Sequence, residues 1–400
     1  MLFQRKLNIK SITDVKNLQG KTVLVRCDFN VALKKNKIID DYKIIKSLPT
    51  IRFLTAKRAK VILVSHLGRP KSLRRVANTR GKYSLKPVAT HLKKLLGKQI
   101  FFIEDFTKNQ AQKKLQDLKN GQIALLENIR LFKGEETNDE QLAKKLSGLA
   151  DLYVNDAMAV SHRPHASVSA IKTYLPAYAG LLLAEEVTNL HKALHPTRPL
   201  VVIIGGSKIE TKVKVIKNLK KKAKFILIGG MITYDFLAAK KLSTGKYKPN
   251  ARDVNMAKKA LGRKIILPLD FIYSDKNDGQ GEASVCSFGN LTKDAFQLDI
   301  GPQTIRLYAQ YIKSAKTIIW NGPMGMFEAQ HFQAGTLSVA RLVASVSRGR
   351  AFTLVGGGET VAALRRTKML DHVDWVSTSG GATLAYLARE KMPGLQQIIS

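Results

Sequence analysis

The stretch VVIIGGSK (201–208) decides the fold, because it is an apolar run that breaks directly into two glycines. A short apolar run that ends in glycine predicts a buried strand of a parallel sheet. Glycine has no Cβ, so the loop after such a strand can bring its N–H groups close to phosphate oxygens. Four more runs in the second half end in the same way: FILIGGM (225–231), TIIWNGPMG (317–325), FTLVGGGET (352–360) and WVSTSGGA (375–382). Five such loops predict the ligand edge of a doubly wound sheet that binds a nucleotide.

The first half shows the same alternation of apolar strands and helical stretches. Its predicted strands are TVLVRCDF (22–29), KVILVSHLG (60–68), QIFFIEDF (99–106), QIALLENIR (122–130) and DLYVNDA (151–157). Between them, Val88, Leu92 and Leu95 have helical spacing and predict a helix over Lys86–Leu96. The fold class that follows is α/β, with two Rossmann-like doubly wound parallel-sheet domains.

An apolar stripe between the two halves predicts the helix that joins them. Leu183, Val187, Leu190 and Leu194 recur at helical spacing, and His195-Pro196 ends the pattern. We therefore expect an N-terminal domain over 1–180, a C-terminal domain over 181–384 and a hinge between them.

Length and composition fit a globular enzyme of two ordinary domains. The chain has 400 residues, of which 44% are hydrophobic and 7% aromatic. No apolar stretch reaches the roughly 18 residues that span a bilayer, and the N-terminus lacks the apolar core of a secretion signal. Cys27 and Cys286 are the two cysteines and form neither a disulfide framework nor a metal-binding pattern. These features predict a cytoplasmic protein.

The net charge is unusual and leaves a second class of function open. Lys and Arg total 67 against 30 Asp and Glu, which gives a net charge of +37. Such a surface attracts polyanions, so a nucleic-acid binder is one alternative. The cations are scattered along the chain without a basic arm or zinc-finger spacing, which favours a solvated basic surface instead.

Polar residues at the strand ends of the first half predict a site for a small anionic ligand. Arginines and histidines gather there, and guanidinium groups bind carboxylates and phosphates in a bidentate manner. Because the carboxyl ends of parallel strands meet at one edge, the residues converge even though each alone fits a surface ion pair. The candidates are Arg26, Asp28, Asn30, His66, Arg69, Arg130, His162, Arg163 and His165. They suit a phosphorylated carboxylate, with Asp28 and Asn30 on its hydroxyl groups.

The second half offers a nucleotide site without a Walker motif, since Gly-x4-Gly-Lys-Ser/Thr is absent. Lys208 and Lys212 follow Gly205-Gly206, where an ammonium group could lie over a transferring phosphate. Glu359 ends a triple glycine and suits a hydrated Mg²⁺ on nucleotide phosphates, although helix capping is an equal alternative. Glu328 could accept hydrogen bonds from both ribose hydroxyls. Phosphoryl transfer between the two halves follows as the expected chemistry.

At this point the chain resembles the phosphoglycerate kinase family from about Val15 to the C-terminus. The segments that carry the resemblance are VLVRCDFNVAL, VSHLGRP, LLENIR, GEETND, YVNDA, SHRPHAS, GGSKIETK, LDIGP, WNGPMGMFE, GGGET and STSGGA. The family implies reversible phosphoryl transfer from 1,3-bisphosphoglycerate to Mg-ADP, which gives 3-phosphoglycerate and Mg-ATP in glycolysis. It also implies a cytosolic monomer whose C-terminal segment, about 385–400 here, packs back on the N-terminal domain.

The resemblance assigns site residues by motif. The substrate-binding residues would be Asp28, Asn30, Lys43, His66, Arg69, Arg130 and Arg163. The nucleotide-binding residues would be Gly205, Lys208, Lys212, Gly230, Asn321, Glu328, Gly356, Gly357, Gly358, Glu359 and Thr360. The catalytic residues would be Lys43, Lys208, Gly357 and Gly380, and Glu359 would be the metal ligand.

Five positions depart from the family pattern. Lys43 stands where the family has a catalytic Arg, and Glu359 stands where it has a metal-binding Asp. Thr211 replaces an Asp, Met231 replaces a glycine on the adenine side, and Ala32 replaces a Pro. Lysine keeps the charge of arginine but loses its planar fork, so reduced activity is expected. A catalytically degenerate paralogue that binds a ligand or partner is the alternative.

Overall fold

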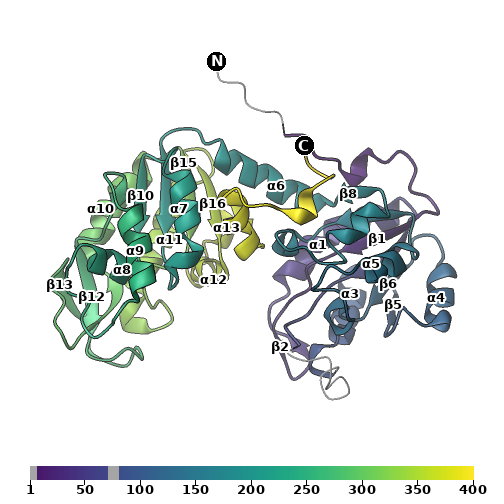
Figure 1. Cartoon of the computed structure of the whole chain (residues 1–400), viewed down its shortest axis with the longest axis horizontal. Coiled ribbons are helices and arrows are strands. Elements are labelled where there is room, and N and C mark those ends of the chain that lie inside the picture. The colour runs from purple at the N-terminus through teal and green to yellow at the C-terminus, as the bar shows by residue number, and fades with distance from the viewer. Residues whose placement is uncertain (1–6, 71–80) are drawn as a thin grey trace. The chain divides into compact units, whose positions relative to one another are not determined.

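The computed structural model describes residues 7–70 and 81–400 and shows two α/β units (Figure 1). One compact unit comprises Met1–Thr188 and Lys391–Ser400, and the other comprises Asn189–Glu390. From the sequence we expected the second domain to begin at residue 181 and the chain to return to the first domain near residue 385. Each unit is described separately below.

The first unit is built on a six-stranded parallel sheet. Its strands lie in the order β5-β6-β4-β1-β7-β8. Their bounds are β1 Thr22–Arg26, β4 Lys60–Val64, β5 Ile100–Ile103, β6 Ile123–Leu126, β7 Leu152–Asn155 and β8 Ala177–Ala179. Five of these are the predicted strands, and all of them pair in parallel. Only β8, which is three residues long, was not predicted.

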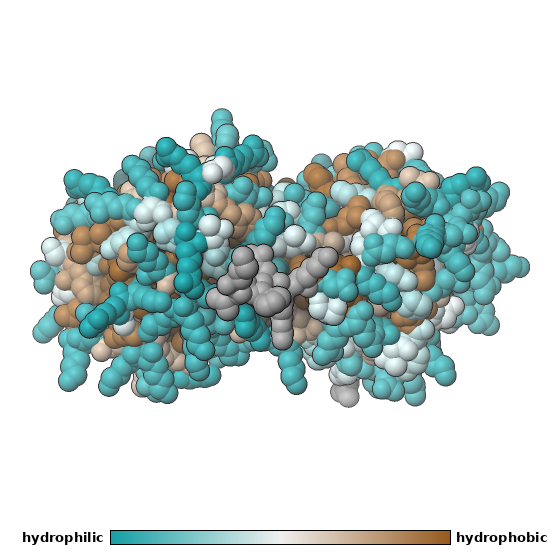
Figure 2. All heavy atoms as spheres, turned by 90° about the horizontal axis from the view of Figure 1, so that it is seen from above, coloured by the Kyte–Doolittle hydropathy of each residue, from teal (hydrophilic) through white to brown (hydrophobic). Residues whose placement is uncertain are grey.

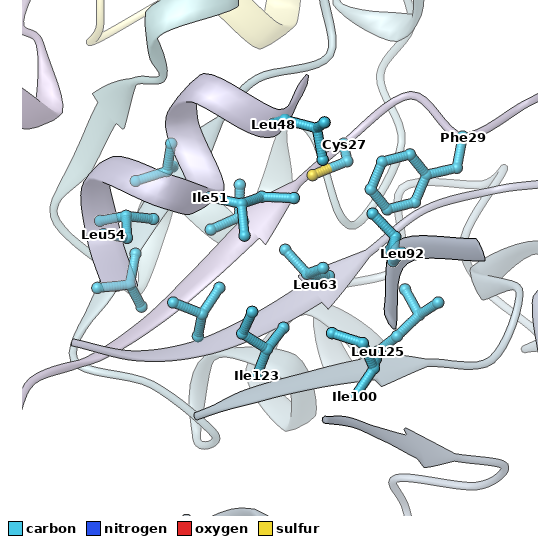
Figure 3. Packing of buried hydrophobic residues seen from close by; sticks show 14 of the residues in the cluster. Cys27, Phe29, Leu48, Ile51, Leu54, Leu63, Leu92, Ile100, Ile123 and Leu125 are labelled. Carbon is cyan, nitrogen blue, oxygen red and sulfur yellow. The ribbon is translucent and has the colours of Figure 1, made fainter. Parts of the chain in front are cut away.

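Helices cover this sheet because alternate strand residues point to opposite faces. The helices are α1 Tyr42–Ala56, α3 Lys86–Leu96, α4 Asn109–Gln116 and α5 Glu140–Ser147. Val23 and Val25 point to the same face as Leu63, where α1 and α3 pack on them in one buried cluster. Figure 3 shows Leu48 and Ile51 of α1 in this cluster, together with Leu92 of α3. The helix predicted over Lys86–Leu96 is confirmed by α3.

The second unit repeats this plan. A six-stranded parallel sheet has the order β11-β10-β9-β15-β16-β17. Its strands are β9 Leu200–Ile204, β10 Phe225–Ile228, β11 Ile265–Ile266, β15 Thr317–Asn321, β16 Phe352–Gly356 and β17 Trp375–Ser377. The helices are α7 Val213–Leu219, α8 Ile232–Ala239, α9 Ala251–Ala260, α10 Pro302–Ser314, α11 Ala334–Val346, α12 Gly358–Arg366 and α13 Gly381–Leu387. α7, α8, α9 and α13 form one packed group, and α10, α11 and α12 form another (Figure 1).

The sequence did not predict the antiparallel structure. Three strands form a small sheet in the order β13-β12-β14, namely β12 Asp270–Ser274, β13 Ser284–Ser287 and β14 Phe296–Ile300. The first unit also has a two-residue hairpin, β2 Leu33–Lys34 with β3 Lys37–Ile38. Short 3₁₀ helices complete the described chain: η1 Ile12–Asp14, η3 Ile129–Leu131, η4 Met158–Val160, η5 Ala170–Thr173, η6 Ile209–Thr211, η7 Gln330–Phe332, η8 Leu370–His372 and η9 Pro393–Leu395.

Helix α6, Leu181–Leu194, begins on residues of the first unit and ends in the second. Its four predicted apolar residues are all buried. A buried carboxylate, Asp156, accepts a hydrogen bond from Leu183 N at 3.1 Å, and Thr50 Oγ1 accepts one from Leu181 N at 3.0 Å. Burial raises the pKa of Asp156 to about 6. These two acceptors fix the beginning of the helix.

The C-terminal segment pairs with residues near the start of the chain. Lys10 N donates to Ile398 O at 2.8 Å, and Ser400 N donates to Asn8 O at 3.1 Å. Gly394 N donates to Ser161 O at 2.8 Å. The last residues therefore belong to the first unit.

Hydrophilic residues predominate on the face seen in Figure 2, with hydrophobic residues scattered among them. Within residues 7–70 and 81–400, no helix combines the length and the apolar character that a membrane crossing requires. Cys27 is buried in the first unit, and both cysteines are free.

Candidate active site

The carboxyl edge of the first sheet brings Asp28, Asn30 and Lys43 together. Asp28 follows β1 and is buried, and its Oδ2 accepts from Lys43 Nζ of α1 at 2.7 Å. Its Oδ1 accepts from Asn30 N at 3.2 Å. Asn30 Oδ1 accepts from Gly68 N at 2.8 Å, and Arg130 Nη1 donates to Gly68 O at 2.7 Å. A single residue in the loop after β4, Gly68, thus connects the loops after β1 and β6.

His66 lies among cations at the centre of this edge. Arg26 Nη2 lies 3.4 Å from His66 Nδ1. Burial lowers the pKa of His66 well below its usual value, and the charges of Arg26, Arg130 and Lys43 lower it further. The imidazole is therefore neutral at pH 7, and the positive charge around it comes from groups that stay protonated.

A buried carboxylate organises the same edge and was not predicted as a site residue. Glu135 accepts from Ser167 N at 2.9 Å and from Ser167 Oγ at 2.7 Å. It lies 3.9 Å from Arg26 Nη2 and 3.7 Å from His165 Nδ1. Arg26 is fully buried, and its Nε donates to Ser167 Oγ at 2.9 Å. The segment GEETND and the HRPHAS loop therefore form one network under the site. The signal available in the sequence was the presence of Glu135 in the motif GEETND, which contains more than one acidic residue.

Two predicted arginines are less firmly held. Arg163 is half-buried, and its Nε donates to His162 Nε2 at 3.1 Å. Its charge contributes to the lowered pKa of Arg130, which places the two guanidinium groups within electrostatic range. Arg69 is exposed in the loop after β4. Arg130 Nε lies within ion-pair distance of Glu136 Oε1, at 3.2 Å, but is not hydrogen-bonded.

The carboxyl edge of the second sheet is made of close backbone contacts that exclude side chains. Gly205 N donates to Asn321 O at 3.0 Å, and Gly230 N donates to Met324 O at 2.7 Å. A Cβ on Gly205 would lie 2.0 Å from Pro323 O, which no side chain tolerates. Gly230 and Gly357 have φ of +65° and +101°, a region that favours glycine. The predicted glycine loops are thus packed against one another.

A chain of polar contacts crosses this edge. Lys212 Nζ donates to Asn321 Oδ1, and Asn321 Nδ2 donates to Gly356 O at 2.7 Å. Thr360 is buried, and its Oγ1 accepts from Gly322 N at 2.8 Å. Burial lowers the pKa of Lys212 to about 8, while Glu359 counteracts part of the shift. Lys212, Asn321 and Thr360 therefore align three of the five glycine-marked loops.

A cavity of about 350 Å³ opens beside these glycines. Gly206 and Gly230 line it, together with side chains of Met231, Glu328 and Glu359. The antiparallel sheet supplies Phe296 and Gln297, and α8 supplies Tyr234. Sequence reasoning missed these three residues because none of them lies within a glycine-marked loop. Apolar and aromatic walls beside bare backbone suit a planar base with phosphates attached.

The remaining predicted residues lie on the same unit but make few contacts. Lys208, Gly358 and Glu359 are exposed, and Gly380 precedes α13 with φ of +48°. Thr211 is exposed, and its Oγ1 donates to Lys208 O at 2.9 Å. Lys208 and Gly380 do not line the cavity.

The carboxylate beside the cavity fits a metal ion that binds together with the phosphates of a nucleotide. The described residues contain no group of three or more His, Cys, Asp or Glu arranged to hold a metal ion alone. Glu359 is a single exposed carboxylate in the first turn of α12, on the wall of the cavity. Magnesium is commonly bound by one or two carboxylates together with substrate phosphates, and this arrangement matches that pattern.

Comparison with known proteins identifies the family. Residues 12–390 match the family model described as phosphoglycerate kinase. The chain belongs to the phosphoglycerate kinase family. It is 40% identical over 397 residues to a phosphoglycerate kinase of Borrelia garinii subsp. bavariensis, covering 98% of this chain and 99% of the relative. It is 42% identical over 396 residues to one of Dictyoglomus turgidum, covering 96% and 98%.

Solved structures agree with the sequence comparison. A phosphoglycerate kinase from Coxiella burnetii is similar with a TM-score of 0.85 and 36% identity, covering 98% of this chain and 99% of that one. One from Pyrococcus horikoshii is similar with a TM-score of 0.84 and 30% identity, covering 98% of each. The predicted two-domain α/β fold and the predicted enzyme class are confirmed, and the activity is reversible phosphoryl transfer in glycolysis.

Proposed function

We propose that the chain moves a phosphoryl group between 1,3-bisphosphoglycerate on its first unit and Mg-ADP on its second. The observation that supports this most strongly is the chemistry of the two sheet edges. The first edge gathers Arg26, Lys43 and Arg130 around neutral His66. The second presents glycine backbone, Lys212 and a cavity of about 350 Å³. Fixed cations suit the phosphorylated carboxylate, and glycine loops suit the nucleotide.

In the reaction, the acyl-phosphate P–O bond of 1,3-bisphosphoglycerate breaks and a new bond forms to a β-phosphate oxygen of ADP. The carboxylate of 3-phosphoglycerate leaves with the electron pair, so no proton transfer to the protein is required. Protein groups contribute position and charge neutralisation. We assign neutralisation to Lys43 and Lys208, and alignment of the glycine loops to Lys212. Magnesium, held by Glu359 and the nucleotide phosphates, would neutralise further phosphate charge.

The remaining substrate contacts follow the same division. We assign the phosphoglycerate to Asp28, Asn30, His66, Arg69, Arg130 and Arg163. We assign the nucleotide to Gly205, Gly230, Asn321, Glu328, Gly356, Gly357, Gly358 and Thr360, with Gly380 beside the transferring phosphate. This division makes the first unit the phosphoglycerate-binding domain and the second the nucleotide-binding domain.

The test is a coupled assay of the purified chain in both directions with Mg²⁺, comparing ADP with GDP. Lys208→Ala should lower kcat by about tenfold or more, because one charge on the transferring phosphate is lost. Lys217→Ala is the matched control, since Lys217 is an exposed lysine of α7 away from the glycine loops. ATP formation at background, with calorimetric binding of 3-phosphoglycerate intact, would instead favour the degenerate paralogue.

We further propose that the enzyme acts as a cytoplasmic monomer, as the resemblance implies. Two free cysteines fit a reducing compartment. Sedimentation of the active protein at working concentration should give a single species near 44.4 kDa. A dimer that persists on dilution would contradict the monomer.

A further inference from the structure

A second anion-receptive hollow lies on the opposite edge of the second sheet. A cavity of about 410 Å³ is lined by residues that precede strands: Arg198 before β9, Lys224 before β10 and Lys264 before β11. Lys221 and Lys222 complete its charged wall. The strands are parallel and β9 has five residues, so roughly 15 Å of strand separates this edge from the glycine loops. The hollow is therefore distinct from the nucleotide site.

The positive charges that line the hollow are not neutralised by acidic side chains among its lining residues. Five of its eight lining residues are Lys or Arg, and none is acidic. Among the residues that the structure describes, none of these five cations has an ion-pair partner within 4.0 Å. Uncompensated like charges repel one another, so an anion bound among them gains attraction from several cations at once.

Two of the ammonium groups are held in place by the backbone. Lys222 is half-buried, and its Nζ donates to Leu194 O. Lys264 is also half-buried, and its Nζ donates to Lys220 O at 2.9 Å. Groups already fixed lose little side-chain entropy on binding. Burial, Arg389 and Arg198 lower the pKa of Lys222, which shows that the neighbouring guanidinium groups lie within electrostatic range.

From this geometry we infer a binding site for a small soluble anion with at least two phosphate groups. Five cations around one hollow exceed what a single phosphate contacts, and Arg198 offers a bidentate fork. The walls contain no aromatic side chain on which a base could stack, and the cations surround a hollow rather than follow a groove. These features favour a small oligophosphate over single-stranded nucleic acid. The site is additional to the transfer reaction and does not depend on it.

The test uses the full chain and inorganic tripolyphosphate in about 150 mM salt, where long-range attraction is screened. Hydrogen exchange reports the site directly, because the amides of 221–224 border the hollow and Lys224 N donates to Leu200 O. Tripolyphosphate should protect these amides. In Lys222→Gln/Lys264→Gln the concentration for half-protection should rise by about tenfold or more, since two charge-assisted contacts are lost.

A second variant and a control keep the result interpretable. Lys221→Gln/Lys224→Gln removes two exposed charges, of which that of Lys224 lies over the Phe225 ring at 5.4 Å, so it tests the site even if the first variant unfolds. Lys113→Gln/Lys114→Gln on α4 makes the same change of net charge in the first unit and should leave the protection unchanged. An equal loss in the control would overturn the site in favour of diffuse attraction. Protection by duplex or single-stranded DNA but not by tripolyphosphate would overturn the small-ligand assignment.

Discussion

At the scale of single residues, the site is set by the partners of a few charges. Asp28 is bound by Lys43 at 2.7 Å, so the residue at position 43 determines how this carboxylate is held. Lysine gives one point contact, whereas arginine would offer a planar fork to both Asp28 and a substrate phosphate. If position 43 is an arginine in the family, as the resemblance implies, the lysine here changes how the site is positioned while keeping its charge.

Replacing Lys43 measures that contribution. Lys43→Met should lower kcat/KM for 1,3-bisphosphoglycerate by about a hundredfold, because a charge near the transferring group is lost and Asp28 loses its ion-pair partner. Lys43→Arg should match or exceed the wild-type rate. Steady-state kinetics of the two variants decides the point, and a wild-type rate in Lys43→Met would remove Lys43 from the mechanism.

The stability of the first unit should depend on His165 in acid. Burial and the charge of Arg26 lower the pKa of His165 to about 3, whereas an unfolded histidine titrates near 6.5. Below about pH 6.5 the unfolded chain gains a proton that the folded chain does not, so this stability is lost as the pH falls from about 6.5 to about 3.

His165→Gln removes this contribution and should reduce the slope of that part of the curve, while buried His66, whose pKa is also lowered, keeps the remainder. Urea unfolding of both proteins between about pH 4 and pH 7 measures the difference. His372→Gln, at an exposed histidine of η8, should keep the wild-type slope. Parallel curves for wild type and His165→Gln would contradict the assignment.

Much of the site could be predicted because polar residues directly after apolar strands must meet at one sheet edge. Asp28, Asn30 and Arg130 were found in this way, and their contacts are present. Glu135 was not found, because it follows no strand and acts through Ser167 and Arg26. A residue that supports others from beneath carries no local pattern in the sequence.

At the scale of elements, the parallel strands were predictable and the antiparallel ones were not. β9 is apolar throughout and is followed by glycine, and β15 has a buried apolar run that ends at Asn321. In the small sheet, buried polar residues flank the apolar run of β12 and interrupt that of β14, and β13 has no buried residue. Without a buried face, alternation is lost, and the signal for a strand disappears.

Helix α10 depends on one carboxylate. Asp270 accepts from Gln303 N at 2.9 Å, and its other oxygen accepts from Thr304 N at 2.8 Å and from Thr304 Oγ1 at 2.7 Å. Asp270→Ala should lower the free energy of unfolding by about 2–3 kcal/mol, because two helix N–H groups lose their buried acceptor. Chemical denaturation measures the change. Asp294→Ala, at an exposed position, should change it by no more than about 0.5 kcal/mol.

The glycine loops should not tolerate a methyl group. A Cβ on Gly230 would lie 2.6 Å from Gly206 N, and φ of +65° is itself unfavourable for alanine. Gly230→Ala should therefore weaken ADP binding by about tenfold or more, because Gly206 and Gly230 must separate. Calorimetry of ADP binding tests this. Gly381→Ala, where a Cβ meets nothing within 4 Å, is the matched control and should bind ADP normally.

At the scale of the whole molecule, two ends of the chain share one unit. Lys172 is buried, and its Nζ donates to Pro393 O and to Gln396 O. Burial lowers its pKa to about 8, so the ammonium form depends on these carbonyls. No pattern near Lys172 predicted this role, since its partners lie more than two hundred residues away in sequence.

Removing this anchor should loosen the C-terminal segment. Lys172→Met should speed hydrogen exchange at Gly394 and Ile398 and lower the free energy of unfolding by about 2 kcal/mol, because two charge-assisted bonds are lost. Lys16→Met, at an exposed lysine of the same unit, serves as the control. Unchanged exchange at both amides would show that the backbone pairing alone secures the segment.

The pairing of Lys10 with Ile398 and of Asn8 with Ser400 also sets an order of events during synthesis. The ribosome synthesises the second unit before it adds Lys391–Ser400, the last residues of the first. The second unit spans Asn189–Glu390, so at about 5–20 residues per second the nearly complete first unit waits roughly 10–40 s for the segment that covers it. A nascent chain stalled or cleaved before residue 391 therefore exposes the buried surface around Ser161 and Lys172, and chaperones and proteases meet an incomplete first unit beside a finished second one.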